Sequence, residues 1–412
     1  MTTTLSRAGA DRRSASSSQT PPRALKRILS LHDFETRARG ALPRPIFGYI
    51  KGAAEDNSSH DDNRAVFNDY ALLTRVLRDV SQRQQTVDVF GQRFSAPFGI
   101  APMGINALST YRGDIVLARA AKAAGIASIM SGTSLIPLED VAQAAPGTWF
   151  QAYLPGDTDR IRALLARVAR AGYRTLVITV DIPVPANREN NIRAGFSTPL
   201  RPSVRLCWDG LTRPRWLLST FLRTLGKHGM PHFENSFATR GAPVLSSNVL
   251  RDFSARDHLS WDHLEIIRRE WKGNLVIKGI LSVEDALLAR RLGADGIILS
   301  NHGGRQLDGT PSPMRILPEV VKAAGGDYPV MIDSGFRRGS DVLKAQALGA
   351  RLVFVGRPFN FAAAVAGEAG VGHAIHLLKE EVDRNMAMMG VNRCEDLTPD
   401  LVLHKHRPPA RP

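Results

Sequence analysis

LVIKGILSVEDALLARRLGADGIILS, residues 275–300, decides the fold class. It holds two short β-branched runs, LVIKG (275–279) and GIILS (296–300). Between them, EDALLARRLGA (284–294) has helical spacing and a glycine stop near its end. A strand that leads through a helix to a second strand predicts a parallel pair, because the helix crossover lets the second strand run in the same direction. The segment is therefore one strand–helix–strand unit of a parallel sheet.

The same unit recurs along the chain, so that eight strands are predicted in all. The other six are PFGIA (97–101), IASIM (126–130), WFQAY (149–153), TLVITVD (175–181), PVMID (329–333) and LVFVG (352–356). Segments with helical spacing that end in a glycine separate most of them. Eight alternating units are the number that closes a barrel, so we predict a single α/β domain with a (β/α)8 TIM barrel.

The C-terminal ends of these strands carry polar or ionisable side chains. Active sites of such barrels lie at that rim. A purely structural barrel would explain the set poorly, because a buried charge without a partner costs several kcal/mol. The residues at the predicted ends are Met103, Gly104, Ser131, Gln151, Tyr153, Thr179, Asp181, Lys278, Ser300, His302, Asp333, Gly356 and Arg357.

Glycine and arginine follow the last two strands. The motif DSGFRRGSD contains Gly335 and Arg337, and VGRPF contains Gly356 and Arg357. In this fold these two loops form the usual phosphate site, because glycines let backbone N–H groups approach the anion and arginine adds paired donors. A phosphate-bearing cofactor is therefore predicted.

SNHGGRQLDG, residues 300–309, resembles the active-site signature of the FMN-dependent L-2-hydroxy-acid oxidase and dehydrogenase family, which includes glycolate oxidase, lactate dehydrogenases and mandelate dehydrogenase. The likeness runs from about Leu31 to about Thr398. It implies FMN as cofactor, a small 2-hydroxy-carboxylate substrate, quinone or oxygen as electron acceptor, and a homotetramer. Further matches are GYIKGAAED (48–56), IAPMG (100–104), TVDIP (179–183), NRENNIR (187–193), IKGI (277–280) and GRPF (356–359).

The resemblance implies catalytic roles for a few of these residues. His302 is implied as the base, with Asp181 holding its ring and stabilising the imidazolium form. Arg188 and Arg305 are implied to clamp the substrate carboxylate and hydroxyl, since a planar fork of donors suits a carboxylate. Further substrate contacts are implied for two tyrosines, Tyr49 and Tyr153, although each could instead be a core aromatic with its hydroxyl satisfied.

Cofactor contacts are implied in the same way. Lys278 is expected beside the isoalloxazine ring, where a fixed cation stabilises the negative charge of reduced flavin. No metal site is predicted, because the histidines and carboxylates lack ligand spacing. The remaining implied contacts are Met103, Gly104, Ser131, Gln151, Thr179 and Ser300 at the ring, Asp333 at the ribityl chain, and Gly335, Arg337, Gly356 and Arg357 at the phosphate.

Charge and cysteine content limit the function classes. The chain has 412 residues with 54 Lys and Arg against 39 Asp and Glu, a net charge of +15, which favours contact with an anionic cofactor, substrate, lipid surface or nucleic acid. We predict no nucleic-acid partner, because the basic residues form no single stripe interleaved with aromatics. Two distant cysteines, Cys207 and Cys394, fit a reducing compartment. The predicted location is cytoplasmic, with peripheral attachment to the inner membrane as the alternative, since no stretch reaches a membrane span.

The connection from Asp181 to Leu275 is far longer than the ~12 to 15 residues of an ordinary loop, and we assign residues 198–250 to an insertion after strand four. A basic amphipathic helix within it, 212–229, is typical of a membrane interface. The related membrane-associated dehydrogenases have their membrane-binding segment at the same place. A lid over the barrel or a subunit contact is the alternative. The predicted apolar face consists of Trp216, Leu217, Leu218, Phe221, Leu222 and Leu225, with Arg213, Arg215, Arg223 and Lys227 nearby.

The ends of the chain are predicted to lie outside the barrel domain, 25–398. Residues 1–24 are rich in Ser, Thr and Arg and are interpreted as a disordered tail, with an organellar transit peptide as the alternative. Residues 399–412 are assigned to a C-terminal tail.

Alternative functions remain open at this point. Gly132 and Thr133 stand where glycolate oxidases carry a large aromatic, which leaves lactate, mandelate or another bulky hydroxy acid as substrate. An oxygen-using oxidase of the glycolate oxidase type is one alternative, and an FMN barrel acting on a different substrate is another. A silent FMN-binding scaffold predicts loss of the base or an arginine, yet His302, Arg188 and Arg305 are all present.

Overall fold

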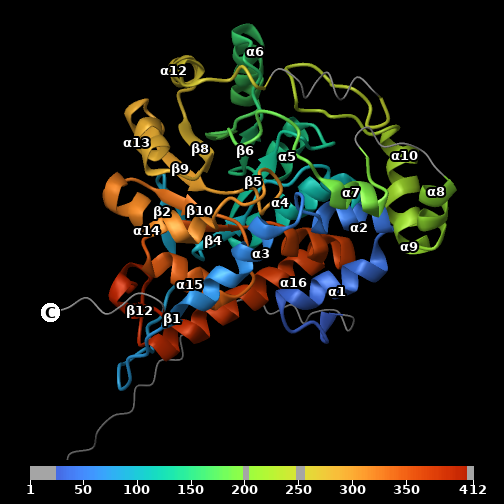
Figure 1. Cartoon of the computed structure of the whole chain (residues 1–412). Helices are drawn as coiled ribbons and strands as arrows, with labels where there is room; N and C mark the ends of the chain where they lie inside the picture. Colours follow the sequence, from blue (N-terminus) through green and yellow to red (C-terminus); the bar gives the residue numbers. More distant parts are fainter. Residues whose placement is uncertain (1–24, 198–203, 247–255, 406–412) are drawn as a thin grey trace, which may run out of the picture.

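The computed structural model describes residues 25–197, 204–246 and 256–405 (Figure 1). Eight parallel strands form a closed barrel in the order β10-β11-β4-β5-β6-β7-β8-β9. The predicted (β/α)8 barrel is confirmed, and each predicted strand overlaps an observed one. The strands are β4 (Phe98–Ile100), β5 (Ala127–Ser131), β6 (Trp149–Ala152), β7 (Thr175–Thr179), β8 (Asn274–Ile280), β9 (Gly296–Leu299), β10 (Val330–Ile332) and β11 (Leu352–Val355).

Helices cover the outside of the barrel (Figure 1). Local signals set their ends: the Asp157 side chain accepts a hydrogen bond from the Arg160 amide at the start of α6, and Gly125, in the left-handed region, ends α4. The helices are α4 (Gly113–Ala124), α5 (Leu138–Ala144), α6 (Thr158–Arg170), α12 (Trp261–Glu270), α13 (Val283–Arg291), α14 (Pro313–Ala324), α15 (Gly339–Ala347) and α16 (Arg357–Met389).

Among the described helices, α16 is long and apolar enough to cross a membrane by length and composition alone. Its backbone leaves helical geometry at Ala366 and Gly367, and it packs against α1 (Leu31–Ala41), α4 and α15. Phe359 and Ile375 are no more than 1% exposed. Packing against the barrel accounts for its apolar composition.

Side chains fill the inside of the barrel next to a two-stranded hairpin, β2 (Val87–Val89) and β3 (Gln92–Phe94), so a ligand site is expected at the opposite end. Inward side chains of neighbouring strands, such as Val177 on β7, Val276 on β8 and Ile298 on β9, form a cluster with this hairpin. This cluster is a packed core rather than a channel. Within the described barrel, space for a ligand is therefore expected toward the opposite end from this hairpin.

The N-terminal part adds α2 (Arg44–Lys51) and α3 (Ser58–Ala65), and then β1 (Tyr70–Leu72). β1 pairs antiparallel with β12 (Val402–His404), so the predicted C-terminal boundary at 398 is too early: residues 399–404 belong to the folded part. A three-residue strand is too short to show an alternating pattern, and its partner lies more than three hundred residues away, so the pairing could not be predicted from local sequence. The predicted tail 1–24 and residues 406–412 lie outside the described residues.

The long connection after β7 begins with α7 (Glu189–Ala194). The predicted insertion within it contains α8 (Val204–Leu211), α9 (Pro214–Trp216), the π-helical turn η4 (Leu217–Leu222) and α10 (Arg223–His228). These four lie together beside α2 and α7 (Figure 1). Residues 198–203 and 247–250 of the predicted insertion are outside the described residues.

The predicted single apolar face of 212–229 is divided in the structure. Trp216 is buried and donates its indole N–H to the Leu108 carbonyl at 2.8 Å. Leu217 and Phe221 pack against the core, whereas Leu218 and Leu222 are 64% and 47% exposed. A π-helical turn changes the spacing of side chains around the axis, so a regular 3.6-residue period could not place these residues correctly.

Candidate active site

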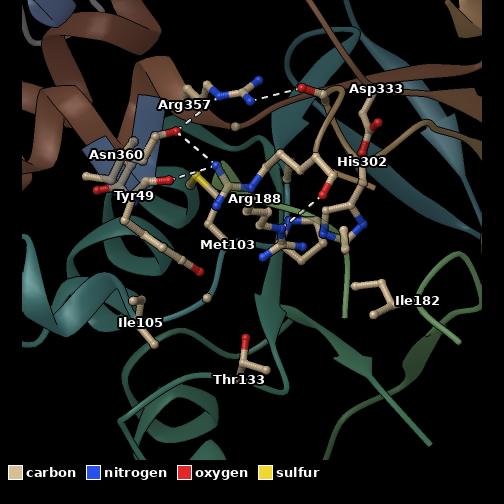
Figure 2. Close-up of a pocket in the computed structure, with 18 of the residues that line it drawn as sticks. Tyr49, Met103, Ile105, Thr133, Ile182, Arg188, His302, Asp333, Arg357 and Asn360 are labelled. Carbon is tan, nitrogen blue, oxygen red and sulfur yellow. Dashed lines mark hydrogen bonds between the residues drawn. The ribbon is translucent and has the colours of Figure 1, made fainter. Parts of the chain in front are cut away.

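A cavity of about 490 Å³ lies at the C-terminal end of the barrel (Figure 2). The structure brings most of the predicted site residues to its wall. They are Tyr49, Met103, Gly104, Tyr153, Arg188, Lys278, His302, Arg305, Asp333, Gly335, Arg337, Gly356 and Arg357. The other five predicted residues lie just behind the wall, where they contact wall residues or sit at the C-terminal ends of barrel strands. They are Asp181, Ser131, Gln151, Thr179 and Ser300.

His302 follows β9 and is held on both its backbone and its ring. Its amide donates to the Ser300 hydroxyl at 3.0 Å, and its Nδ1 lies 3.1 and 3.2 Å from the carboxylate oxygens of Asp181. A carboxylate only accepts, so Nδ1 carries the hydrogen and Nε2 keeps a free lone pair. Gly279 makes this approach possible, because a Cβ there would lie 2.7 Å from the Asp181 Cβ.

The electrostatics of this pair favour a neutral imidazole. Burial lowers the pKa of His302, the Asp181 carboxylate opposes the change, and the Lys278 ammonium adds to it. Burial would raise the pKa of Asp181, but His302 and Lys278 outweigh it and the pKa lies below its usual value. At neutral pH the pair is therefore an uncharged imidazole oriented by a carboxylate, which is the arrangement of a general base.

Two guanidinium groups, those of Arg188 and Arg305, line the same cavity as His302, and Figure 2 shows Arg188 close to it. Arg305 donates through Nη1 to the Tyr49 carbonyl at 2.7 Å, while its Nη2 is buried without a hydrogen-bond partner among the described residues. Arg188 donates through Nε to the Arg305 carbonyl at 2.9 Å and through Nη2 to Gln306. Burial, and then Arg188, lower the pKa of Arg305 to about 10, so it stays charged at neutral pH. A buried charged donor without a partner points to an anionic ligand.

The ends of β6 and β7 carry further polar atoms without hydrogen-bond partners among the described residues, and Lys278 lies on the neighbouring β8. Gln151 Nε2 and Thr179 Oγ1 are buried and have no hydrogen-bond partner among the described residues. Lys278, 3% exposed, lies 2.7 Å from the Ser300 hydroxyl and 3.1 Å from an Asp333 oxygen. The unpaired atoms of Gln151 and Thr179 cost about 1–3 kcal/mol each, so they fit a bound group with donors and acceptors along its edge, as a flavin ring has.

The predicted phosphate region joins the cavity at the ends of β10 and β11. Gly335 has φ +88°, and a Cβ there would lie 2.0 Å from the Asn63 carbonyl, so only glycine fits. Arg337 is partly buried, and desolvation followed by the nearby Arg64 charge lowers its pKa to about 10. Arg357 differs from the prediction in part: its Nε and Nη2 donate to the backbone carbonyls of Ile50, Gly52 and Gly303 (Figure 2). These hydrogen bonds of Arg357 therefore link the C-terminal end of α2 to the loop after β9 that carries His302.

A buried polar network holds the loop that follows β4. Asn106 donates to the Met103 carbonyl at 2.8 Å and to Asp114 at 3.0 Å, and it accepts from Asn360 at 2.7 Å. Ile105, within this loop, has φ +50°. The network fixes an otherwise unfavourable backbone at the cavity wall.

Asp114 makes this network sensitive to pH. Burial raises its pKa to about 6, although hydrogen bonds from Asn106 and Ser134 oppose the change. The folded state therefore holds the proton more tightly than the unfolded state, and the free energy of unfolding falls as pH rises from about 4 to about 6. Asp114→Asn keeps an acceptor for Asn106 but removes the charge. We expect its stability relative to the native protein to rise over this range, by up to about 3 kcal/mol, and then level off.

Chemical denaturation at several pH values measures this difference. Asp159→Asn, at a side chain that is 95% exposed, is the control and should show no such trend. A constant difference between Asp114→Asn and the native protein at every pH would contradict the expectation.

Sequence reasoning missed several cavity residues. Ile105 and Asn360 follow strand ends, and their positions could have identified them. Phe233 and Val244 come from the insertion and Arg256 from the segment between it and α12, where no strand end or period indicates the barrel. The Arg256 guanidinium lies 4.6 Å from the centre of the Tyr153 ring. Phe196 also lines the cavity, from just after α7.

Comparison with known proteins identifies the family. A model of the FMN-dependent dehydrogenases matches residues 38–404. The chain belongs to this family. Among curated relatives, (S)-mandelate dehydrogenase of Pseudomonas putida is 38% identical over 374 residues, which cover 90% of this chain and 93% of that protein. L-lactate dehydrogenase of Ectopseudomonas mendocina is 39% identical over 375 residues, which cover 90% of this chain and 97% of that protein.

Solved structures agree with this assignment. The monotopic membrane protein (S)-mandelate dehydrogenase has a TM-score of 0.86 at 37% identity, covering 92% of this chain and 100% of that one. A mandelate oxidase variant with 2-hydroxy-phenylacetamide has a TM-score of 0.74 at 33% identity, covering 89% and 96%. This FMN-dependent dehydrogenase is therefore an oxidoreductase with FMN as its cofactor, and the predictions of family, enzyme class and cofactor are confirmed. The unpaired polar atoms at the ends of β6 and β7 fit that cofactor.

Proposed function

We propose that this FMN-dependent dehydrogenase oxidises an L-2-hydroxy acid of the lactate or mandelate type to the 2-keto acid and passes the electrons to a quinone. The observation that carries the proposal is the His302 imidazole, held by Asp181, in the same cavity as Nη2 of Arg305, which has no hydrogen-bond partner among the described residues. When bound, FMN accepts the two electrons released on oxidation of the substrate.

The side chains divide the work on the substrate. Arg305 and Arg188 bind the carboxylate and orient C2 and its hydroxyl toward Nε2 of His302. Nε2 takes a proton, and Asp181 stabilises the resulting imidazolium. The same base serves whether the proton leaves the hydroxyl or C2. Burial raises the pKa of Tyr153, so its hydroxyl stays protonated and acts with Tyr49 as a donor to substrate oxygens.

Further residues hold the cofactor. Lys278 places a fixed cation, itself balanced by Asp333, at the edge of the ring. The remaining proposed contacts are Met103, Gly104, Ser131, Gln151, Thr179 and Ser300 at the ring, Asp333 at the ribityl chain, and Gly335, Arg337, Gly356 and Arg357 at the phosphate.

A steady-state survey tests the proposal. L-lactate, L-mandelate and glycolate are each supplied with a soluble quinone analogue, and then with oxygen alone. We expect keto acid to form from an L-2-hydroxy acid, much faster with the quinone analogue. Equal rates with oxygen would favour the oxidase alternative, and no keto acid from any of them would overturn the proposal.

We also propose that the α8–α10 segment attaches the enzyme to the cytoplasmic face of an anionic inner membrane. Val204, Trp208 and Leu211 follow each other at helical spacing on α8 and are 89%, 66% and 62% exposed. Leu218 and Leu222 are exposed on the neighbouring turn, and Arg215 and Lys227 are exposed nearby. Exposed large apolar side chains flanked by cations favour a lipid interface.

The double variant Trp208→Glu, Leu211→Glu is expected to bind anionic lipid vesicles about 10-fold or more weakly than the native protein. Each change removes apolar area that the lipid would bury and adds a carboxylate that the anionic headgroups repel. Co-sedimentation measures the bound fraction. Leu77→Glu, at a fully exposed leucine elsewhere, is the control and should bind like the native protein. Unchanged sedimentation of the double variant would contradict the attachment.

A homotetramer is proposed from the family resemblance. Light scattering of the detergent-treated protein is expected to give about four times the 45.0 kDa chain mass. The mass of a single chain would contradict it.

A further inference from the structure

The second half of the insertion forms a closed loop, residues 231–244, called the docked loop below. The Phe233 amide donates to the Ala242 carbonyl at 3.1 Å, and the Val244 amide to the Pro231 carbonyl at 2.9 Å. At the turn, the Gly241 amide donates to the Phe233 carbonyl at 3.0 Å. A Cβ on Gly241 would lie 2.5 Å from that carbonyl oxygen, so the turn needs glycine. The docked loop is therefore a defined structure rather than a passive connection.

Buried polar contacts fix the docked loop to the barrel. Asn235 is 1% exposed, and its side chain accepts from the Leu138 amide at 2.8 Å and donates to the Ile136 carbonyl at 2.8 Å. Arg167 on α6 donates to the carbonyls of Glu234 and Phe237 at 2.8 and 3.0 Å. A buried amide with both ends satisfied allows little movement, so the docked loop holds one position over the ends of the strands.

The docked loop presents apolar side chains to the cavity. Phe233 and Val244 are 4% and 6% exposed, and both line it. The barrel supplies Ile105 and Thr133 to the same cavity, and Figure 2 shows these two on the side away from Asp333 and Arg357. The wall of the cavity thus contains a group of mainly apolar side chains in addition to its charged groups.

We propose that the docked loop is the specificity wall of the substrate pocket and selects 2-hydroxy acids that carry an aryl group on C2. This inference rests on the proposed function. An aryl ring would fill the space between Phe233, Val244 and Ile105 and make close contacts there. A methyl group, as in lactate, would leave a void, and the atoms lining a void lose their dispersion contacts.

The proposal predicts a measurable preference. Each missing methylene in an apolar pocket changes kcat/KM by about 10- to 200-fold, so L-mandelate should exceed L-lactate by at least about 10-fold in the native enzyme. Phe233→Ala removes the largest side chain of the wall. We expect the mandelate-to-lactate ratio of kcat/KM to fall by about 10-fold or more.

The matched control is Phe237→Ala, in the same loop. The Phe237 ring packs under Arg160 at 5.4 Å and does not line the cavity, so this variant should keep the native ratio. A second readout is equilibrium binding of phenylglyoxylate and pyruvate to the oxidised enzyme, followed by the change in flavin absorbance. Phe233→Ala should weaken the binding of phenylglyoxylate much more than the binding of pyruvate. Val244→Ala and Phe233→Leu repeat the test if Phe233→Ala binds no FMN.

The outcomes separate the two proposals. Equal losses for both substrates and both ligands, or an unchanged ratio in Phe233→Ala, would overturn the docked loop as a specificity wall while leaving 2-hydroxy-acid oxidation intact. A native preference for lactate would do the same. Absence of flavin reduction by every 2-hydroxy acid would overturn both.

Discussion

His302→Asn is expected to slow the anaerobic reduction of the flavin by an L-2-hydroxy acid by about 10³- to 10⁴-fold, since general-base catalysis contributes up to about that much. Asparagine can still donate to Asp181, which lies 3.1 Å from Nδ1 of the native ring, so the surrounding structure should persist. The variant should contain FMN and unfold at a temperature close to that of the native enzyme. Stopped-flow absorbance measures the rate of reduction.

The dependence of kcat/KM on pH is an independent test of His302 as the base. Because burial lowers the pKa of His302, the base form is present from below the usual value of about 6.5 upward. For the native enzyme, kcat/KM should rise with pH through a pKa below that value, and this limb should be absent in His302→Asn. His258→Asn, at a side chain that is 74% exposed, is the control. Near-native reduction by His302→Asn would rule out the imidazole as the base.

Arg305→Lys is expected to lower kcat/KM by about 10²- to 10³-fold, because hydrogen bonds to charged groups contribute about 1.5–3 kcal/mol each and lysine lacks the planar fork. The loss should appear in binding of the carboxylate as well as in turnover. It is measured as the dissociation constant of a 2-keto acid for the oxidised enzyme and as kcat/KM.

Arg305 also contacts the Tyr49 carbonyl and lies 4.9 Å from the centre of the Tyr49 ring, so a structural effect has to be separated from a loss of binding. Retained FMN content together with weaker keto-acid binding would identify the carboxylate contact. Arg193→Lys, at a side chain that is 69% exposed on α7, should behave like the native enzyme. Native keto-acid affinity in Arg305→Lys would refute the clamp.

The barrel could be predicted because each strand–helix unit is a local pattern. The short β-branched run and the helix that follows it need no knowledge of distant residues. His302 and Lys278 could be placed for the same reason, since the carboxyl ends of parallel strands meet at one rim. Their pairing with Asp181 and Asp333 then follows from the closed order of the strands.

Other features depend on contacts between distant residues and could not be read from the chain. The β1–β12 pair joins two three-residue strands with no alternation to detect. The commitment of Arg357 to backbone carbonyls depends on where α2 lies, which no local pattern records. Phe233 and Val244 reach the cavity only because Asn235 docks their loop, and a single buried asparagine looks like any other polar loop residue in a sequence.

Oxidation of a 2-hydroxy acid by the bound flavin is tested by anaerobic titration of the purified enzyme with limiting amounts of the L and, separately, the D isomer of one 2-hydroxy acid. Bleached flavin and keto acid are counted in the same sample. One keto acid is expected for each flavin bleached, with the L isomer and not with the D isomer. Bleaching without keto acid, or equal bleaching by both isomers, would contradict this expectation.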